Sequence, residues 1–119
     1  MDPQRLMAAG LLIAVSGCAN APKQPSAELV GFQNFALVAC LSTFIQSELS
    51  LHDLSLAASG YMQRGSLPLE SYEAVRTAIS NWPFEKYTSH SGETIKSAAC
   101  LDFHRSAEIE HIFDRFSAG

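Results

Sequence analysis

The stretch "FQNFALVACLSTFIQS", residues 32–47, decides the fold. Its apolar side chains recur every three or four residues, which is the spacing of one face of an α-helix. That face consists of Phe32, Phe35, Ala36, Ala39, Cys40 and Phe44. The other sides are apolar as well, through Leu37, Val38, Leu41 and Ile45. A helix that is apolar nearly all round is predicted to lie at the centre of the core or in a dimer interface.

The residues that follow predict two further helices. Ser50-Leu-His-Asp53 resembles a capping box, which predicts a second helix from there to about Arg64, with Gly65 as its stop. Pro68 suits the first turn of a third helix, and Pro83 ends that helix. The side chains that recur at helical spacing along it are Leu69, Tyr72, Val75, Arg76, Ile79 and Trp82.

The C-terminal part predicts an exposed loop and two more helices. Residues 83–92, "PFEKYTSHSG", are polar and rich in hydroxyl groups, which is typical of a loop. A fourth helix is predicted from about Ser91 to His104, with Ile95, Ala99 and Phe103 on one face. Ser106 is expected to cap the last helix, whose apolar stripe is Ile109, Ile112, Phe113 and Phe116. The predicted class is all-α, a small compact bundle of about five helices.

The N-terminus predicts an export signal. Residues 6–15 are apolar but too few to cross a membrane core of about 30 Å as a helix, and they lie between a charged start and small residues. Val15-Ser16-Gly17-Cys18 resembles the lipobox of bacterial lipoproteins, in which the chain is cut before the cysteine and the thiol is acylated. A plain signal peptide, or a buried N-terminal helix with an incidental cysteine, is the alternative.

These features predict three segments. Residues 1–17 are expected to be a lipoprotein-type signal peptide, residues 18–28 a flexible tether, and residues 29–119 the helical domain. Lipidated Cys18 would hold the domain at a membrane, and Ala19 after it resembles the pattern sorted to the outer membrane. The expected location is therefore the periplasm, anchored to the outer membrane, with no membrane contact other than the lipid.

The three cysteines predict one disulfide. If Cys18 is acylated, Cys40 and Cys100 are left as an even pair in an oxidising compartment, and a bond between them would join the first helix to the fourth. Such a bond would close a loop of about 60 residues and stabilise the fold by roughly 4 kcal/mol in the chain-entropy model.

Catalytic and metal-binding readings of the same residues are weaker. Cys100 and His104 are one helical turn apart, and a neighbouring histidine is how thiol nucleophiles are activated, but a disulfide would abolish the nucleophile. The remaining histidines, His52, His90 and His111, lack ligand spacing. We therefore predict no enzyme activity, no metal and no cofactor.

The charge of the chain excludes one class of partner. Eight basic and twelve acidic residues give a net charge of −4, and loss of Arg5 and Asp2 with the signal leaves that balance unchanged. Nucleic acid is therefore not an expected partner. A mild negative charge fits a basic protein partner, and it equally fits ordinary solubility.

Three segments carry a resemblance to a known family. They are "LVACLSTF" (37–44), "DLSLAASGYMQRGSLPLESYEAV" (53–75) and "KYTSHSGETIKSAACLDFHRSAEIEHIF" (86–113). In this order and spacing they resemble the immunity proteins of type VI secretion amidase effectors, subfamily four, from about Asn34 to Phe116. The lipobox departs from the family pattern, whose members resemble soluble periplasmic proteins with cleavable signals.

The resemblance implies a function and a contact surface. It implies that residues 29–119 form an immunity domain, usually a homodimer and in some complexes two-plus-two with its effector. The effector is a cysteine peptidase that cuts peptidoglycan stem peptides. One subunit presents a helix to its cleft and the other a loop. By position, the loop residues are Glu85, Lys86, Tyr87, Thr88, Ser89, His90 and Ser91, and the helix residues are Glu70, Glu73 and Thr77.

Other interpretations stay open at the level of sequence. The loop residues are equally typical of a solvated linker, and Glu70 and Glu73 also favour the start of a helix. The domain could inhibit another wall hydrolase such as a lysozyme. It could also be an envelope lipoprotein that acts as a structural scaffold.

Overall fold

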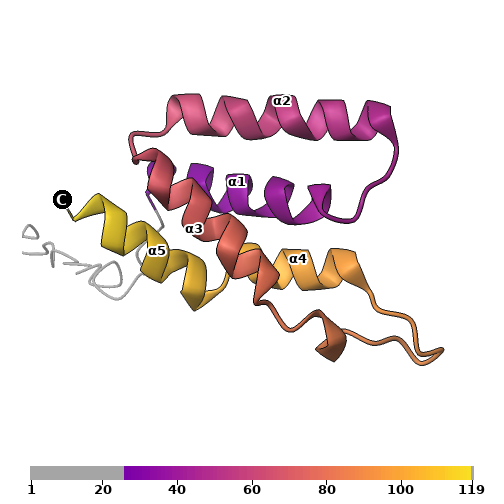
Figure 1. Cartoon of the computed structure of the whole chain (residues 1–119). Coiled ribbons are helices and arrows are strands. Elements are labelled where there is room, and N and C mark those ends of the chain that lie inside the picture. Colours follow the sequence, from indigo (N-terminus) through magenta and orange to yellow (C-terminus); the bar gives the residue numbers. More distant parts are fainter. Residues whose placement is uncertain (1–25, 119) are drawn as a thin grey trace, which may run out of the picture.

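The computed structural model describes residues 26–118, and within them the chain is mostly helical (Figure 1). The α-helices are α1 (Ala27–Ser42), α2 (Glu48–Arg64), α3 (Leu69–Ser80), α4 (Lys96–His104) and α5 (Ala107–Ser117). A short 3₁₀ helix, η3 (Phe84–Lys86), follows α3. The all-α prediction is confirmed. The predicted signal peptide, Cys18 and most of the predicted tether lie outside the described residues.

Helix α1 is the centre of the bundle, as its apolar pattern predicts. It packs against each of the other four α-helices. The residues of its predicted stripe are buried, apart from the half-buried Phe44, which lies beyond the end of the helix. Aromatic contacts join it to α3, because the Phe35 ring meets the Tyr72 ring edge-on at a centroid distance of 4.8 Å. The first helix thus lies in the core.

The start of α1 lies upstream of the prediction. The helix begins at Ala27 rather than near Phe32, because the Ser26 hydroxyl accepts a hydrogen bond from the Leu29 amide and caps the first turn. Glu28, in that turn, accepts hydrogen bonds from the amide and hydroxyl of Ser66. The predicted tether of residues 18–28 therefore overlaps the helix at its last two positions, and Glu28 belongs to the fold.

The connection between α1 and α2 also differs from the prediction. Helix α1 ends at Ser42 rather than Ser47, and the Ser42 and Thr43 hydroxyls donate to carbonyls one turn back. Ser47 then caps α2, its hydroxyl accepting from the Ser50 amide at 3.4 Å, so the capping box predicted at Ser50 is wrong by one turn. The predicted end of α2 at Arg64 and Gly65 is confirmed.

The disulfide is present as predicted. Cys40 on α1 and Cys100 on α4 are bonded, with their Cα atoms 5.6 Å apart and 60 positions apart in sequence. Both side chains are fully buried. The bond ties α4, which has only nine residues, to the central helix. Because α4 follows directly on the polar loop, the bond also anchors the end of that loop to the core.

Candidate functional site

Helix α3 presents one buried face and one exposed face. Its inner face consists of Ser71, Tyr72, Val75, Ala78 and Ile79, which are buried. The three helix residues implicated by the family resemblance, Glu70, Glu73 and Thr77, are all exposed. Thr77 donates only to the backbone carbonyl of Glu73, one turn earlier. The acidic and hydroxyl groups of α3 are therefore available to a partner.

The predicted loop is an ordered hairpin rather than a free linker. An antiparallel bridge pairs Thr88 with Thr94, and the Ile95 amide donates to the Tyr87 carbonyl at 2.7 Å. At the tip, the Ser89 amide donates to the Glu93 carbonyl at 2.8 Å. We call residues 87–95 the hairpin and residues 89–92 its tip. The fourth helix consequently begins at Lys96 and not near Ser91, because residues 92–95 are engaged in the turn and the pairing of the hairpin.

A glycine allows the tip to turn back. Gly92 has a φ of +90°, which side chains other than glycine rarely adopt, and its amide donates to the Ser89 carbonyl at 3.0 Å. A turn followed by a left-handed glycine is a common way to close a short hairpin. The Ser89 hydroxyl adds a hydrogen bond from the Glu93 amide and another with Ser91. The tip is thus held in one conformation by its own backbone and hydroxyls.

The loop residues divide into exposed and supporting side chains. Glu85, Lys86, Thr88, His90 and Ser91 are exposed, whereas Tyr87 and Ser89 are half-buried. Burial, and then the neighbouring Asp102 carboxylate, raise the pKa of Tyr87 above 10.0, while Trp82 acts in the opposite direction. Tyr87 therefore stays protonated and neutral. Its contact with Asp102 of α4 makes Tyr87 a support for the hairpin. Tyr87 is therefore less accessible to a partner than His90 and Ser91 are.

The hairpin and the exposed face of α3 lie at different places on the subunit. The hairpin leaves the C-terminal end of α3 and projects beyond the bundle (Figure 1). Glu70, at the start of α3, lies at the opposite end of that helix. Thr77, near the C-terminal end, borders a hollow of about 640 Å³ between α3 and α5, together with Trp82, Ile112 and Arg115. One subunit therefore offers two surfaces, the hairpin and the outer face of α3, and they are farthest apart at Glu70.

The catalytic reading of Cys100 is not compatible with the bonded form of the chain. The Cys100 sulfur is joined to Cys40 and buried, so it is not a free thiolate. His104 is also buried, and its Nδ1 lies 2.7 Å from the Leu101 carbonyl oxygen, within its own helix. Among residues 26–118, no three His, Cys, Asp or Glu side chains gather where they could hold a metal ion. No helix in that range is long and apolar enough to span a membrane.

The sequence places this architecture in a family. The family model for Tai4, described as type VI secretion system (T6SS), amidase immunity protein, matches residues 31–113. The chain belongs to the Tai4 family. No curated protein matches the chain.

The Tai4 match covers most of the described fold. It extends from the first turns of α1 into α5, and it includes both cysteines of the disulfide, the exposed face of α3 and the whole hairpin. All ten residues that the resemblance implicates in effector contact lie inside the matched range. Membership in this family makes the chain a type VI secretion amidase immunity protein at the level of the family.

One exposed residue of this Tai4 chain was missed by the sequence pattern. Arg76 is one of the side chains that recur at helical spacing along the third helix, and it is exposed on α3, where its guanidinium carbon lies 5.6 Å from the centroid of the buried Phe35 ring. Leu69, from the same set, is 58% exposed. An arginine within an otherwise apolar stripe was the available signal, since its charge is costly to bury.

Proposed function

We propose that the chain protects its cell by binding a cognate peptidoglycan amidase in the periplasm and obstructing the cleft of that enzyme. The observation that carries the proposal is the Tai4 match over residues 31–113. The proposed contacts are the exposed residues of the hairpin region, Glu85 to Ser91, and the outer face of α3, formed by Glu70, Glu73 and Thr77. The chain acts by steric obstruction and performs no chemistry of its own.

The geometry of the hairpin supports this role. A peptidase cleft is built to hold a peptide and offers hydrogen-bonding groups to it. The tip presents exposed His90 and Ser91 on a turn whose backbone is already paired. Because the tip is ordered before binding, little conformational entropy is lost on association. The disulfide supports the same location, since structural disulfides form in oxidising compartments such as the periplasm.

We further propose that the active form is a homodimer bound to two effector molecules. In this arrangement the α3 face of one subunit and the hairpin of the other contact the same amidase. The separation of these two surfaces on one subunit favours that division of labour. The sequence around Cys18 adds the proposal that the mature chain is anchored to the outer membrane by acylation, with residues 1–17 removed as the signal.

The proposal is tested by inhibition of the amidase encoded beside this chain. Purified mature protein, with Cys18 replaced by serine, is titrated into the amidase acting on peptidoglycan, and cell lysis is followed when both are exported together. We expect stoichiometric inhibition and rescue from lysis. The tip variant His90→Trp and the α3 variant Thr77→Arg should each weaken inhibition at least tenfold, because a bulky group at a packed interface centre prevents closure.

The matched control for His90→Trp is Gln63→Trp, which places a tryptophan at an exposed position of α2, away from both proposed contact surfaces. It should inhibit as the wild type does. Failure of the wild-type chain to inhibit its neighbouring amidase would refute the proposal. Inhibition of lysozyme instead would assign it to another wall hydrolase, and an envelope defect in a deletion strain without any toxin would indicate a scaffold.

A further inference from the structure

Two adjoining hollows lie between α2 and α3. Both helices pack against α1, but they barely touch each other. One hollow of about 240 Å³ lies between α1, α2 and Arg76, and another of about 320 Å³ lies between α1, α3 and Phe84. Ala39 and Arg76 border both hollows, so the two lie next to each other. We call the two hollows together the α2–α3 trough.

Apolar and hydroxyl side chains line the trough. In one hollow the Phe44 and Phe84 rings meet edge-on at a centroid distance of 4.9 Å, and in the other Leu51 and Met62 of α2 contribute to the wall. Hydroxyl groups in the lining come from Ser42, Thr43, Ser55, Ser59 and Ser80. The hydroxyls of Ser42, Thr43 and Ser80 already donate to backbone carbonyls one turn back. The hydroxyls that can donate to a polar partner are therefore those of Ser55 and Ser59 on α2.

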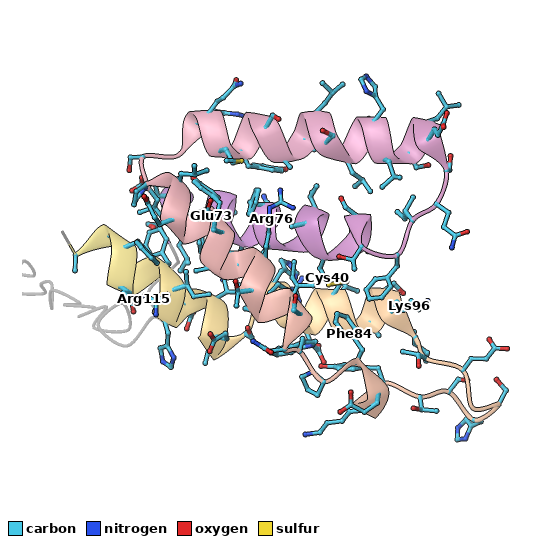
Figure 2. All side chains as sticks on the ribbon, in the orientation of Figure 1. Cys40, Glu73, Arg76, Phe84, Lys96 and Arg115 are labelled. Atoms are coloured by element: carbon cyan, nitrogen blue, oxygen red, sulfur yellow. A yellow bond between two sulfur atoms is a disulfide. The ribbon has the colours of Figure 1, made fainter. Side chains whose placement is uncertain are left out.

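The charge of the trough is opposite to that of the whole chain. Acidic residues outnumber basic ones by twelve to eight in the chain, yet none of the residues that line either hollow is acidic. Arg76 borders both hollows, and its guanidinium rests over the Phe35 ring (Figure 2). Lys96 Nζ lies 5.0 Å from the centroid of the Phe44 ring.

From this placement we propose that the α2–α3 trough binds an acidic segment of the effector, with a carboxylate of that segment paired to Arg76. The inference rests on the proposed function and specifies the chemistry of the partner. Arginine presents a planar fork that matches a carboxylate through two parallel hydrogen bonds. The contact with Phe35 holds the guanidinium in place before binding, so less side-chain entropy is lost on association. Apolar neighbours of the carboxylate pack against Phe44, Phe84 and Met62.

The inference predicts a specific loss of affinity on charge reversal. The dissociation constant for the cognate amidase is measured by calorimetry for wild type and Arg76→Glu, at low and physiological salt. We expect Arg76→Glu to bind at least about 30-fold more weakly, since reversal removes the pair and repels the partner's acid. The matched control is Arg105→Glu, an exposed arginine at the end of α4 and outside the trough. It should change affinity less than threefold.

A second variant separates binding from folding. Ser55→Glu places a carboxylate at the exposed rim of the trough without removing Arg76, and it should also weaken binding, whereas Gln63→Glu on the same helix should not. Circular dichroism and thermal unfolding verify that each variant is folded. Binding by Arg76→Glu and Ser55→Glu within threefold of wild type would overturn the inference.

The outcomes distinguish this inference from the proposed function. If His90→Trp abolishes inhibition while Arg76→Glu binds normally, the hairpin mechanism stands and the trough inference falls. If Arg76→Glu instead converts a dimer to a monomer with unchanged effector affinity, the trough contacts a second copy and the inference is again overturned. If the wild-type chain does not bind the amidase, both proposals fall.

Discussion

Removal of the Cys40–Cys100 bond should destabilise the chain more than any surface change. The two cysteines are separated by 60 positions, and a loop of that length corresponds to about 4 kcal/mol of unfolding free energy in the chain-entropy model. Small domains have only about 5–15 kcal/mol in total. Because 1 kcal/mol moves the midpoint of a domain of this size by about 4–8 °C, we expect the thermal midpoint to fall by roughly 15–30 °C.

The test compares three forms of the exported chain, all carrying Cys18→Ser so that the remaining pair cannot exchange with a third thiol. These are the oxidised chain, the same chain after reduction, and the Cys40→Ala/Cys100→Ala variant. Urea unfolding is followed by far-ultraviolet circular dichroism. The double variant should be less stable than the reduced chain as well, because it also loses two fully buried sulfur atoms from the core.

Two results would refute this reasoning. One is a loss of less than about 1 kcal/mol in the double variant, which would mean that packing of α1 on α4 alone holds the short helix in place. The other is complete alkylation of Cys40 and Cys100 in the native exported chain, measured by mass spectrometry without prior reduction.

Two further predictions concern the tyrosines. A Cβ atom at Gly65 would lie 2.5 Å from the Tyr72 hydroxyl oxygen, so Gly65→Ala should cost about 1–3 kcal/mol by urea unfolding. The control Gly31→Ala, with open space around it, should be neutral or stabilising, and equal effects of the two changes would contradict the steric explanation. Burial raises the pKa of both Tyr72 and Tyr87 above 10.0, with added contributions from Glu28 and Asp102 respectively. Above pH 10 the unfolded chain releases the two tyrosine protons more readily than the folded chain does. The contribution of these groups to the free energy of unfolding should therefore be complete below pH 10 and be lost as the pH rises beyond it. Tyr87→Phe should lessen this fall between pH 9 and 11, and an unchanged slope would show that Tyr87 is not the source.

The sequence predicts the core of this fold well because the core positions follow from patterns within single helices. The buried positions of α1 follow from one apolar pattern, and Ser106 caps α5 as expected by accepting from the Ile109 amide. The Cys40–Cys100 pair was predicted by setting Cys18 aside as acylated and by expecting an oxidising compartment, and this bond is present. Each of these features depends on residues a few positions apart or on a single chemical constraint.

The features that the sequence does not predict depend on contacts between distant segments. Helix α1 begins at Ala27 partly because Glu28 meets Ser66, which lies 38 positions away. The start of α2 was misplaced because Ser47 and Ser50 both have capping chemistry, and propensity does not choose between them. Helix α4 begins late because the hairpin uses the backbone of residues 92–95.

The effector contacts stay a prediction, and the shape of the surface around them does not follow from the sequence. Position relative to the family segments indicated Glu85 to Ser91 and the outer face of α3, and those helix residues are exposed. The α2–α3 trough depends on two helices that share α1 as a support but diverge from each other, and no periodicity in either helix reports that divergence.

The closed tip has a consequence for survival of the antidote itself. Proteases usually nick exposed loop tips, and an inhibitor that enters a peptidase is offered directly to the enzyme's nucleophile. Here the Ser89, Gly92 and Glu93 amides are already engaged, so the segment cannot be drawn out straight without first undoing the turn. If the tip enters the amidase as proposed above, the enzyme would meet a closed turn and not an extended peptide aligned for attack.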